Sequence, residues 1–233
     1  MPAPDFRFEK IFWRWKYRFI AGVDEVGRGS FAGPVVAGCV VFSEETIVPQ
    51  DVSVNDSKKV SPGKREEAAM WIKENSLAWG IGEAPASLIN RIGMAKATKR
   101  AFRKAISEAR KRLGKPIDYL LIDAFFIPYV SGLPAKRRKD PQGRFRKNPK
   151  GRQMAIVDGD EKSLTIAAAS IIAKVYRDKL MASLSKKQNL KKYGWERNKG
   201  YGTRQHQRAL KKYGLTRYHR KEFVNSFFSS PSR

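Results

Sequence analysis

Three short apolar runs, far apart in the chain, each lead directly into acidic residues. These runs and the acids after them are residues 19–23 before Asp24 and Glu25, residues 119–122 before Asp123, and residues 154–157 before Asp158 and Asp160. Short apolar runs of this kind are typical of buried strands. Because ligands of an α/β sheet usually bind where strands end at one edge, these acids are predicted to converge on one site.

Helical patterns alternate with the apolar runs. Ser61-Pro62 offers a helix N-cap and a first-turn proline, and apolar stripes or alanine-rich composition indicate helices over residues 87–112 and 164–184. Two further strands are predicted at residues 34–42 and 77–81. Strands interleaved with helices predict an α/β fold with a mixed central β-sheet flanked by helices.

The chain is long enough for one large domain with additions at both ends, since it has 233 residues of which 41% are hydrophobic. Residues 1–18 form a basic-aromatic N-terminal extension, and residues 19–186 carry the α/β pattern. Residues 187–233 lack a convincing strand and are predicted to form a helical C-terminal appendage with a short helix near residues 205–212. The segment at residues 134–152 holds nine basic residues and one acid and is predicted to be a loop or a flexible hairpin.

Positive charge is the dominant surface property of the chain, with 48 Lys and Arg against 22 Asp and Glu and a formal net charge of +26. Nucleic acid is therefore the predicted partner. A membrane role is not expected, because no apolar run reaches spanning length. The N-terminus lacks the compact apolar region of a secretion signal, and Cys39 is the single cysteine, so the protein is predicted to be cytoplasmic and Cys39 a packing residue.

Carboxylates that share one pocket point to bound cations. Two carboxylates about 4 Å apart repel by roughly 4 kcal/mol at an effective dielectric constant near 20, so a cluster of them raises pKa values unless cations bind. Oxygen ligands favour Mg²⁺ or Mn²⁺, and two such ions can support hydrolysis of a phosphodiester. The alternative is that each acid is an ordinary strand-end cap or a partner for the abundant Lys and Arg.

The segments around these acids resemble ribonuclease HII, the type 2 ribonuclease H that cuts RNA within DNA duplexes. The matching segments, in chain order, are residues 22–29 (Gly-Val-Asp-Glu-Val-Gly-Arg-Gly), 32–37 (Ala-Gly-Pro-Val-Val-Ala), 55–59 (Asn-Asp-Ser-Lys-Lys), 121–123, 159–160, 166–178 and 198–203 (Asn-Lys-Gly-Tyr-Gly-Thr). Ordered agreement from Ala21 to Phe223 is far more specific than a lone Asp-Glu pair.

The resemblance implies a ribonuclease H-like fold and an endoribonuclease that cuts on the 5′ side of ribonucleotides in RNA/DNA hybrids or in DNA duplexes, leaving 3′-hydroxyl and 5′-phosphate ends. It implies two divalent ions, Mn²⁺ or Mg²⁺, during catalysis. The implied catalytic and metal-binding residues are Asp24, Glu25, Asp123 and Asp160. Nothing in the sequence suggests an obligate oligomer, so a monomer is expected.

The resemblance also implies a set of substrate-binding residues. Residues Gly27, Arg28 and Gly29 would sense the ribose 2′-hydroxyl through backbone groups, because glycine lets the main chain come close to a sugar. Tyr201 would stack on the neighbouring deoxyribose. Backbone phosphates would be held by Asn55, Ser57, Lys58, Ser170 and Lys174. Turn formation and helix solvation are the alternative roles for these residues.

The chain departs from the family pattern in its acids and its basic residues. Asp158 stands where relatives often carry a basic residue, so it competes with Asp160 as the ligand, and Asp160 is preferred. The basic loop at 134–152 is either a solvated linker or an added clamp on the phosphate backbone. His206 and His219 are expected to be structural or to lie near phosphates rather than to be catalytic, because a two-metal mechanism needs no imidazole base. The tryptophans Trp71, Trp79 and Trp195 are expected to pack rather than to stack on bases.

Two other functions are open at this point. A non-catalytic basic nucleic-acid-binding protein fits the composition, but a pure binder gains nothing from anions beside phosphate. A transposase-like or type 3 ribonuclease H enzyme would share the fold. The type 3 enzymes resemble one another in having an extra N-terminal domain, and about two dozen residues precede Asp24 here.

Overall fold

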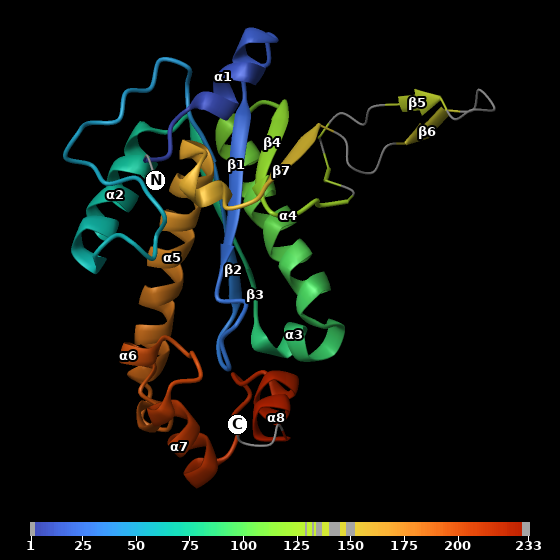
Figure 1. Ribbon diagram of the computed structural model, residues 1–233. Helices are drawn as coiled ribbons and strands as arrows, with labels where there is room; N and C mark the ends of the chain where they lie inside the picture. Colours follow the sequence, from blue (N-terminus) through green and yellow to red (C-terminus); the bar gives the residue numbers. More distant parts are fainter. Residues whose placement is uncertain are drawn as a thin grey trace.

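The computed structural model describes residues 3–128, 130–131, 133, 137–139, 145–147 and 152–229. At its centre is a five-stranded mixed sheet with the strand order β3-β2-β1-β4-β7 (Figure 1). Its strands are β1 (Ile20–Val26), β2 (Val35–Val41), β3 (Ala78–Ala84), β4 (Tyr119–Asp123) and β7 (Gln153–Ile156). The predicted mixed sheet flanked by helices is thereby confirmed.

Strand β1 joins an antiparallel half of the sheet to a parallel half. It pairs antiparallel with β2 as far as Val26, but its parallel pairing with β4 stops where Val23 faces Ile122. The sequence had indicated that Asp24 and Glu25 follow the end of the first strand. In the structure they lie inside β1. The longer antiparallel ladder keeps the strand extended past its last parallel partner.

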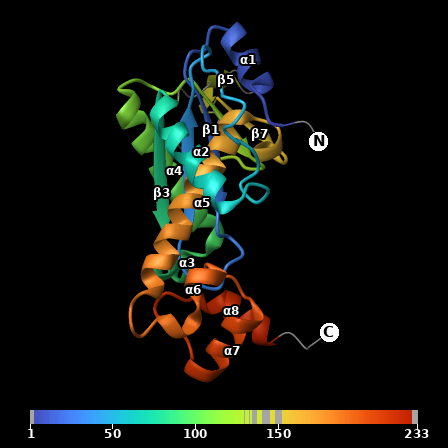
Figure 2. The same ribbon diagram turned by 90° about the vertical axis from the view of Figure 1, so that its left-hand side faces the viewer.

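One long helix covers each face of the sheet (Figures 1 and 2). Helix α4 (Met94–Leu113) packs on β3 and β2, and helix α5 (Leu164–Ser185) packs on β1 and β2. Glycine makes the close approach of α5 possible, because a Cβ at Gly22 would lie 2.1 Å from the backbone of Thr165. These contacts hold the acidic strand β1 directly against the first turn of α5.

The stripe at residues 87–112 predicts one helix, and the structure contains two. Helix α3 (Ala86–Ile92) ends at Gly93, whose φ of 79° lies in the left-handed region, and α4 starts immediately afterwards. The apolar spacing continues across the break because both helices pack on the same core, so the hydrophobic pattern alone does not reveal the break.

Helices α2 (Pro62–Asn75) and α1 (Arg7–Arg14) lie beside α5 and the sheet (Figures 1 and 2). Phe12 and Trp13 of α1 are buried in a cluster with residues of β1, β4 and α5. The basic-aromatic N-terminal segment is thus part of the packed structure, and its aromatic residues bury apolar surface.

The C-terminal segment packs at the end of the molecule opposite α1 (Figure 2). Its helices are α6 (Trp195–Asn198), α7 (Arg204–Tyr213) and α8 (Lys221–Ser229), preceded by the short 3-10 helix η2 (Lys191–Tyr193). Their core contains Trp195 and Tyr193 and also Phe31 and Ala32, which belong to the loop between β1 and β2. The appendage is therefore packed directly on the loop that follows the first two acids.

The basic loop carries two short strands outside the main sheet. Strands β5 (Arg137–Lys139) and β6 (Phe145–Lys147) pair antiparallel with each other. The other residues from 134 to 151 lie outside the described part of the chain, so the choice between a linker and a phosphate clamp stays a prediction.

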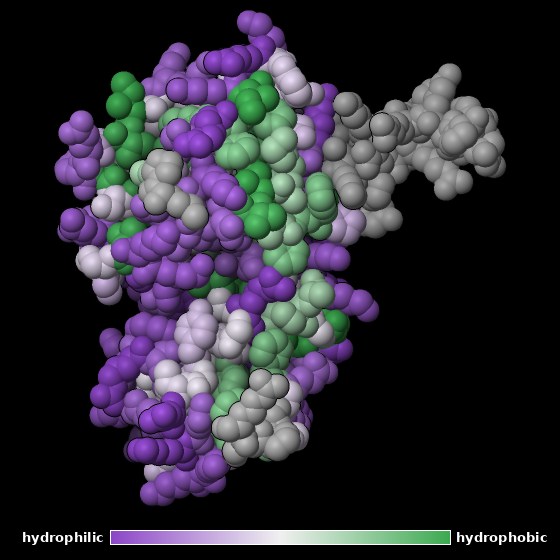
Figure 3. Space-filling model, in the orientation of Figure 1, coloured by the Kyte–Doolittle hydropathy of each residue, from purple (hydrophilic) through white to green (hydrophobic). Residues whose placement is uncertain are grey.

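Cys39 is fully buried in the core beside α4, where burial raises the pKa of its thiol, as expected for a packing residue. Hydrophilic residues dominate the left-hand side of the face in Figure 3, over α2 and the upper part of α5. Within the described ranges, no helix combines the length and the hydrophobicity that crossing a bilayer requires.

Candidate active site

A cavity of about 680 Å³ lies where β1, β4 and the turn after β7 meet the side of α5. All four predicted carboxylates line it: Asp24, Glu25, Asp123 and Asp160. Of the nine predicted substrate-binding residues, seven also line it: Gly27, Arg28, Ser57, Lys58, Ser170, Lys174 and Tyr201. The fold therefore brings together residues that lie far apart in the sequence.

Two predicted residues do not line this cavity. Gly29 is exposed beside Arg28, and a Cβ at its position would meet no atom within 4 Å. Asn55 lines a neighbouring cavity of about 530 Å³, and its side-chain oxygen accepts a hydrogen bond from the backbone N–H of Asp56 at 2.8 Å. In this structure Asn55 therefore shapes its own turn, which was the alternative role considered for it.

The two acids of β1 are held in an environment that opposes their ionisation. Asp24 is 4% exposed, and burial together with the charge of Glu25 raises its pKa well above the ordinary value. Burial also raises the pKa of Glu25 to about 7, although Arg28, whose guanidinium lies 3.3 Å from Glu25 Oε1, lowers it in part. The other oxygen, Oε2, is buried and has no hydrogen-bond partner among the described residues.

The other two acids come from β4 and from the turn after β7. Asp123 ends β4, and its Oδ1 accepts a hydrogen bond from the Gly159 N–H at 2.8 Å; burial raises its pKa. Asp160 lies in the 3-10 helix η1 (Gly159–Glu161), where burial raises its pKa to about 6 while Lys58, 3.7 Å away, opposes the shift.

Asp158 does not line the cavity, which supports the choice of Asp160. Its φ of 52° turns the chain at the end of β7, and its side chain is 68% exposed, 3.9 Å from Lys162. The following turn brings Asp160 back over the sheet edge, where its side chain is 10% exposed. The backbone reversal at Asp158 separates two acids that are only two positions apart in the sequence.

The donor set fits hard divalent cations. Four carboxylates with raised pKa values face one cavity, and within the described part of the chain one of their oxygens, Glu25 Oε2, is buried without a partner. Such oxygens are the ligands that Mg²⁺ and Mn²⁺ prefer. Among the described residues no three Asp, Glu, His or Cys side chains are drawn together into a coordination cluster. Arg28 and Lys58 are the cations that contact Glu25 and Asp160 in this structure.

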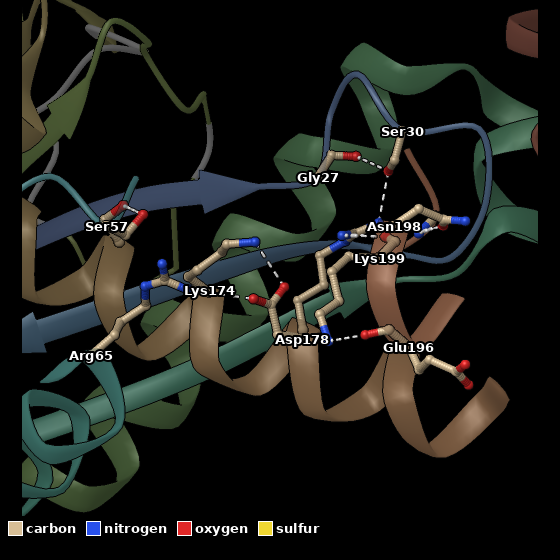
Figure 4. A network of polar contacts seen from close by, with 12 residues as sticks. Gly27, Ser30, Ser57, Arg65, Lys174, Asp178, Glu196, Asn198 and Lys199 are labelled. Atoms are coloured by element: carbon tan, nitrogen blue, oxygen red, sulfur yellow. Dashed lines mark hydrogen bonds and ion pairs between the residues drawn. The ribbon is translucent and has the colours of Figure 1, made fainter. Parts of the chain in front are cut away.

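A line of polar side chains runs along α5 on the opposite wall of the cavity (Figure 4). Ser170 lies 3.0 Å from Ser57, and Lys174 donates to Asp178 at 2.8 Å. Asp178 also contacts Arg65 of α2 at 3.4 Å. Arg65 lines the cavity and was missed by the sequence analysis. A buried arginine in an otherwise exposed stretch of helix gives no periodic signal.

Two buried arginines hold the glycine-rich loop that follows β1. Arg177 of α5 donates to the Pro34 carbonyl at 3.0 Å and to Ser30 Oγ at 2.7 Å. Arg220 donates to the carbonyls of Gly27 and Arg28 at 2.7 and 2.8 Å. Neither role was predicted, but an arginine among the apolar residues of an alanine-rich helix was a usable signal for Arg177.

The histidines and the tryptophans lie outside the cavity lining. His206 and His219 are buried in the appendage, and Trp195 is fully buried beside them. Trp71 and Trp79 pack against the core cluster between α5 and the sheet. The predicted packing roles of the tryptophans are consistent with this burial.

Solved structures place this architecture in a known class. A ribonuclease H2 from Pyrococcus horikoshii matches 91% of this chain and 100% of its own, with a TM-score of 0.63 and 23% identity. A ribonuclease HIII in complex with Mn²⁺ matches 91% of this chain and 68% of its own, with a TM-score of 0.64 and 17% identity. The protein therefore has the ribonuclease H-like fold that the sequence predicted.

Sequence comparison then identifies the family. The model of the ribonuclease HII family matches residues 21–228, and the chain belongs to that family. Ribonucleases HII of Caldanaerobacter subterraneus and Clostridioides difficile are each 42% identical to it, over 93% and 90% of this chain and 78% and 71% of their own lengths. The Bacillus subtilis ribonuclease HII is 41% identical over 94% of this chain and 76% of its own. The chain is thus an enzyme of the ribonuclease H class.

Proposed function

We propose that this protein is an endoribonuclease that hydrolyses the phosphodiester on the 5′ side of ribonucleotides in RNA/DNA hybrids and in DNA duplexes with embedded ribonucleotides. The products carry 3′-hydroxyl and 5′-phosphate ends. Catalysis uses two divalent ions, Mn²⁺ or Mg²⁺, held by Asp24, Glu25, Asp123 and Asp160. The protein acts as a monomer in the cytoplasm.

One observation carries this proposal: four carboxylates from three separate segments, of which Asp24 and Asp160 are buried, share one cavity with lysines that can bind phosphate. Without bound cations, four carboxylates would repel a phosphate group. Two divalent ions bound there would supply an activated water and stabilise the leaving oxygen. The same arrangement disfavours the alternative of a purely non-catalytic binder, because the basic surface would bind a duplex better without these acids.

The chain's own residues position the nucleic acid. Arg220 donates hydrogen bonds to the carbonyls of Gly27 and Arg28 and so fixes this part of the loop. The backbone there would contact the ribose 2′-hydroxyl. Tyr201, which also lines the cavity, would stack on the neighbouring deoxyribose. Lys58 and Lys174 would contact backbone phosphates, together with Ser57 and Ser170.

A cleavage assay tests the proposal. Duplex DNA with a single ribonucleotide is incubated with the protein in Mn²⁺, in Mg²⁺ or in a chelator, beside an all-DNA duplex and an RNA/DNA hybrid. We expect metal-dependent cleavage on the 5′ side of the ribonucleotide and no cleavage of all-DNA. Tight binding of every duplex without cleavage in either metal would refute the nuclease and favour the non-catalytic binder.

The Asp24→Asn variant tests the metal assignment. It should reduce the cleavage rate by about a thousandfold or more, because it removes a buried ligand, while duplex affinity stays largely intact on the cationic surface. The matched control is Asp158→Asn, since Asp158 is an acid at the same sheet edge that does not line the cavity. Retained activity in Asp24→Asn, or equal loss in both variants, would contradict the assignment.

A further inference from the structure

The chain contains two histidines, and both rings are buried in the appendage next to each other. Their Nε2 atoms lie 3.1 Å apart. The Nδ1 atom of His206 lies 2.9 Å from the carbonyl oxygen of Tyr201, and the Nδ1 atom of His219 lies 2.9 Å from the backbone nitrogen of Thr216. A continuous row of hydrogen bonds therefore ends at the backbone of a residue that lines the cavity.

Two groups that can donate a hydrogen bond but cannot accept one determine which nitrogen of each imidazole carries the proton. The Thr216 backbone N–H can only donate, so His219 Nδ1 accepts and the proton of this ring is on Nε2. The Trp195 indole N–H also can only donate, and it lies 3.1 Å from His206 Nε2, so that atom accepts and the proton of His206 is on Nδ1. The two assignments are compatible, because His219 Nε2–H then donates to His206 Nε2 and shares its single lone pair with the Trp195 N–H in a three-centre hydrogen bond.

The end of the row is equally well defined. The Tyr201 carbonyl can only accept, and it receives the His206 Nδ1–H. A second proton on His206 would face the Trp195 N–H, and one on His219 would face the Thr216 backbone N–H; the Thr216 hydroxyl, 2.9 Å from the same Nδ1, can donate or accept. The indole and backbone N–H donors thus favour two neutral rings, in agreement with burial, which lowers the pKa of His206 and lowers that of His219 to about 3.

The turn that carries Tyr201 is also attached to the loop after β1. The Gly200 carbonyl accepts from the N–H groups of Phe31 and Ala32 at 2.8 and 3.1 Å. The ring of Tyr201 lies 5.3 Å from the guanidinium of Arg177, the arginine that holds that loop. The position of Tyr201 is therefore set from the loop on one side and from the histidine row on the other.

We infer that His206 and His219 are positioning residues: in fixed, opposite tautomers they transmit the placement of the appendage to the Tyr201 backbone and so align the Tyr201 ring with the nucleic acid. The role of Tyr201 rests on the proposed function, whereas the tautomers do not. The two parts can therefore fail separately.

The tautomers are tested on the unmodified protein by long-range ¹H–¹⁵N NMR of the imidazoles at neutral pH. Since the chain has two histidines, the spectrum contains two rings. We expect one Nδ1–H ring and one Nε2–H ring, with His219→Gln assigning the Nε2–H pattern to His219. Two rings of the same tautomer, the reversed assignment or a charged ring would overturn the row, whatever the cleavage assay shows.

The effect on Tyr201 is tested with a double-mutant cycle on the single-ribonucleotide duplex. His206→Phe should lower kcat/KM by about tenfold or more, and adding it to Tyr201→Ala should cause little further loss, because both changes act through one ring. Leu210→Ala is the matched control: it loosens the packing of the same helix but leaves the four hydrogen bonds in place. Additive losses, or an equal loss in Leu210→Ala at matched stability, would refute the positioning role.

Discussion

Glu25 and Asp160 line the cavity of the proposed metal site, although their burial weakens the fold at neutral pH. Burial raises their pKa values to about 7 and about 6, so in the folded protein both bind protons more tightly than in the unfolded chain. At low pH this favours the folded state. As the pH rises from the unfolded values near 4 through the folded values, the two groups must ionise in a buried site and stability is lost.

The raised pKa values of Glu25 and Asp160 predict how the stability of the metal-free protein depends on pH. Its melting temperature should fall between pH 5 and pH 8, and Asp160→Asn should melt several degrees higher than the unmodified protein at pH 8 but not at pH 5. Mn²⁺ should raise the melting temperature of the unmodified protein at pH 8 and have less effect on the variant. Thermal denaturation with chelator or Mn²⁺ measures this. An equal response of both proteins to pH would show that Asp160 ionises freely.

Gly27 and Gly29 flank Arg28 but differ in what surrounds them. Gly27 has a φ of 87°, and a Cβ there would lie 2.2 Å from Arg177 Nε. Gly27→Ala should therefore cost about 2 kcal/mol or more of unfolding free energy. Gly29→Ala meets no atom within 4 Å and should change stability by less than about 0.5 kcal/mol.

The cleavage activity of Gly29→Ala tests whether the glycine at this position serves the substrate. If the backbone at Gly29 approaches the sugar, Gly29→Ala should lower kcat/KM although its melting temperature is unchanged. Denaturant unfolding and single-turnover cleavage measure the two properties. Full activity of Gly29→Ala would show that substrate binding does not depend on the absence of a Cβ at position 29.

At the scale of elements, helix α5 is attached to the N-terminal helix by one buried carboxylate. Glu9 is fully buried, and its Oε1 accepts from Ser163 Oγ, Thr165 Oγ1 and the Thr165 N–H at 2.7, 2.6 and 3.1 Å. A carboxylate at a helix N-terminus is also favoured by the helix dipole. Gly22 of β1 touches the backbone of the same Thr165. The first turn of α5 is thereby fixed against the strand that carries Asp24.

Glu9→Ala should accordingly destabilise the protein by about 2–4 kcal/mol, because it leaves several buried donors without an acceptor. Glu9→Gln keeps an acceptor oxygen and should cost less. The control is Glu66→Ala, which removes an exposed ion pair with Lys179 and should cost less than about 1 kcal/mol. Urea unfolding compares the three variants. Equal small losses in all of them would mean that the first turn of α5 is held by packing alone.

At the scale of the whole molecule, the net charge of +26 should supply most of the affinity for nucleic acid, because cationic side chains bind the phosphate backbone. The loop at residues 134–152 carries nine of the basic residues. If it contacts phosphates, replacing it with a Gly-Ser loop of equal length should flatten the dependence of log Kd on log salt by about 0.9 for each lost contact. Fluorescence anisotropy at several salt concentrations measures the slope. An unchanged slope would show that the loop is a linker.

Much of the architecture was predictable because it depends on local patterns. The apolar runs at residues 119–122 and 154–157 and the alanine-rich stretch at 164–184 appear as β4, β7 and α5 with shifts of a residue or so. Local patterns were insufficient at Gly93, where a left-handed glycine breaks a continuous apolar stripe, and in β1, whose length depends on its pairing with β2.

For the candidate site, the sequence alone determined which chemical groups are available: acids that follow apolar runs, an arginine between glycines, and lysines. The tertiary structure decided which of them meet. It placed Asp160 in the cavity and turned Asp158 away, added Arg65, and used Arg177, Arg220, Glu9 and the histidine pair as supports. The physical reason is that side-chain identity is local, whereas burial, pKa and hydrogen-bond partners arise from segments that are adjacent only after folding.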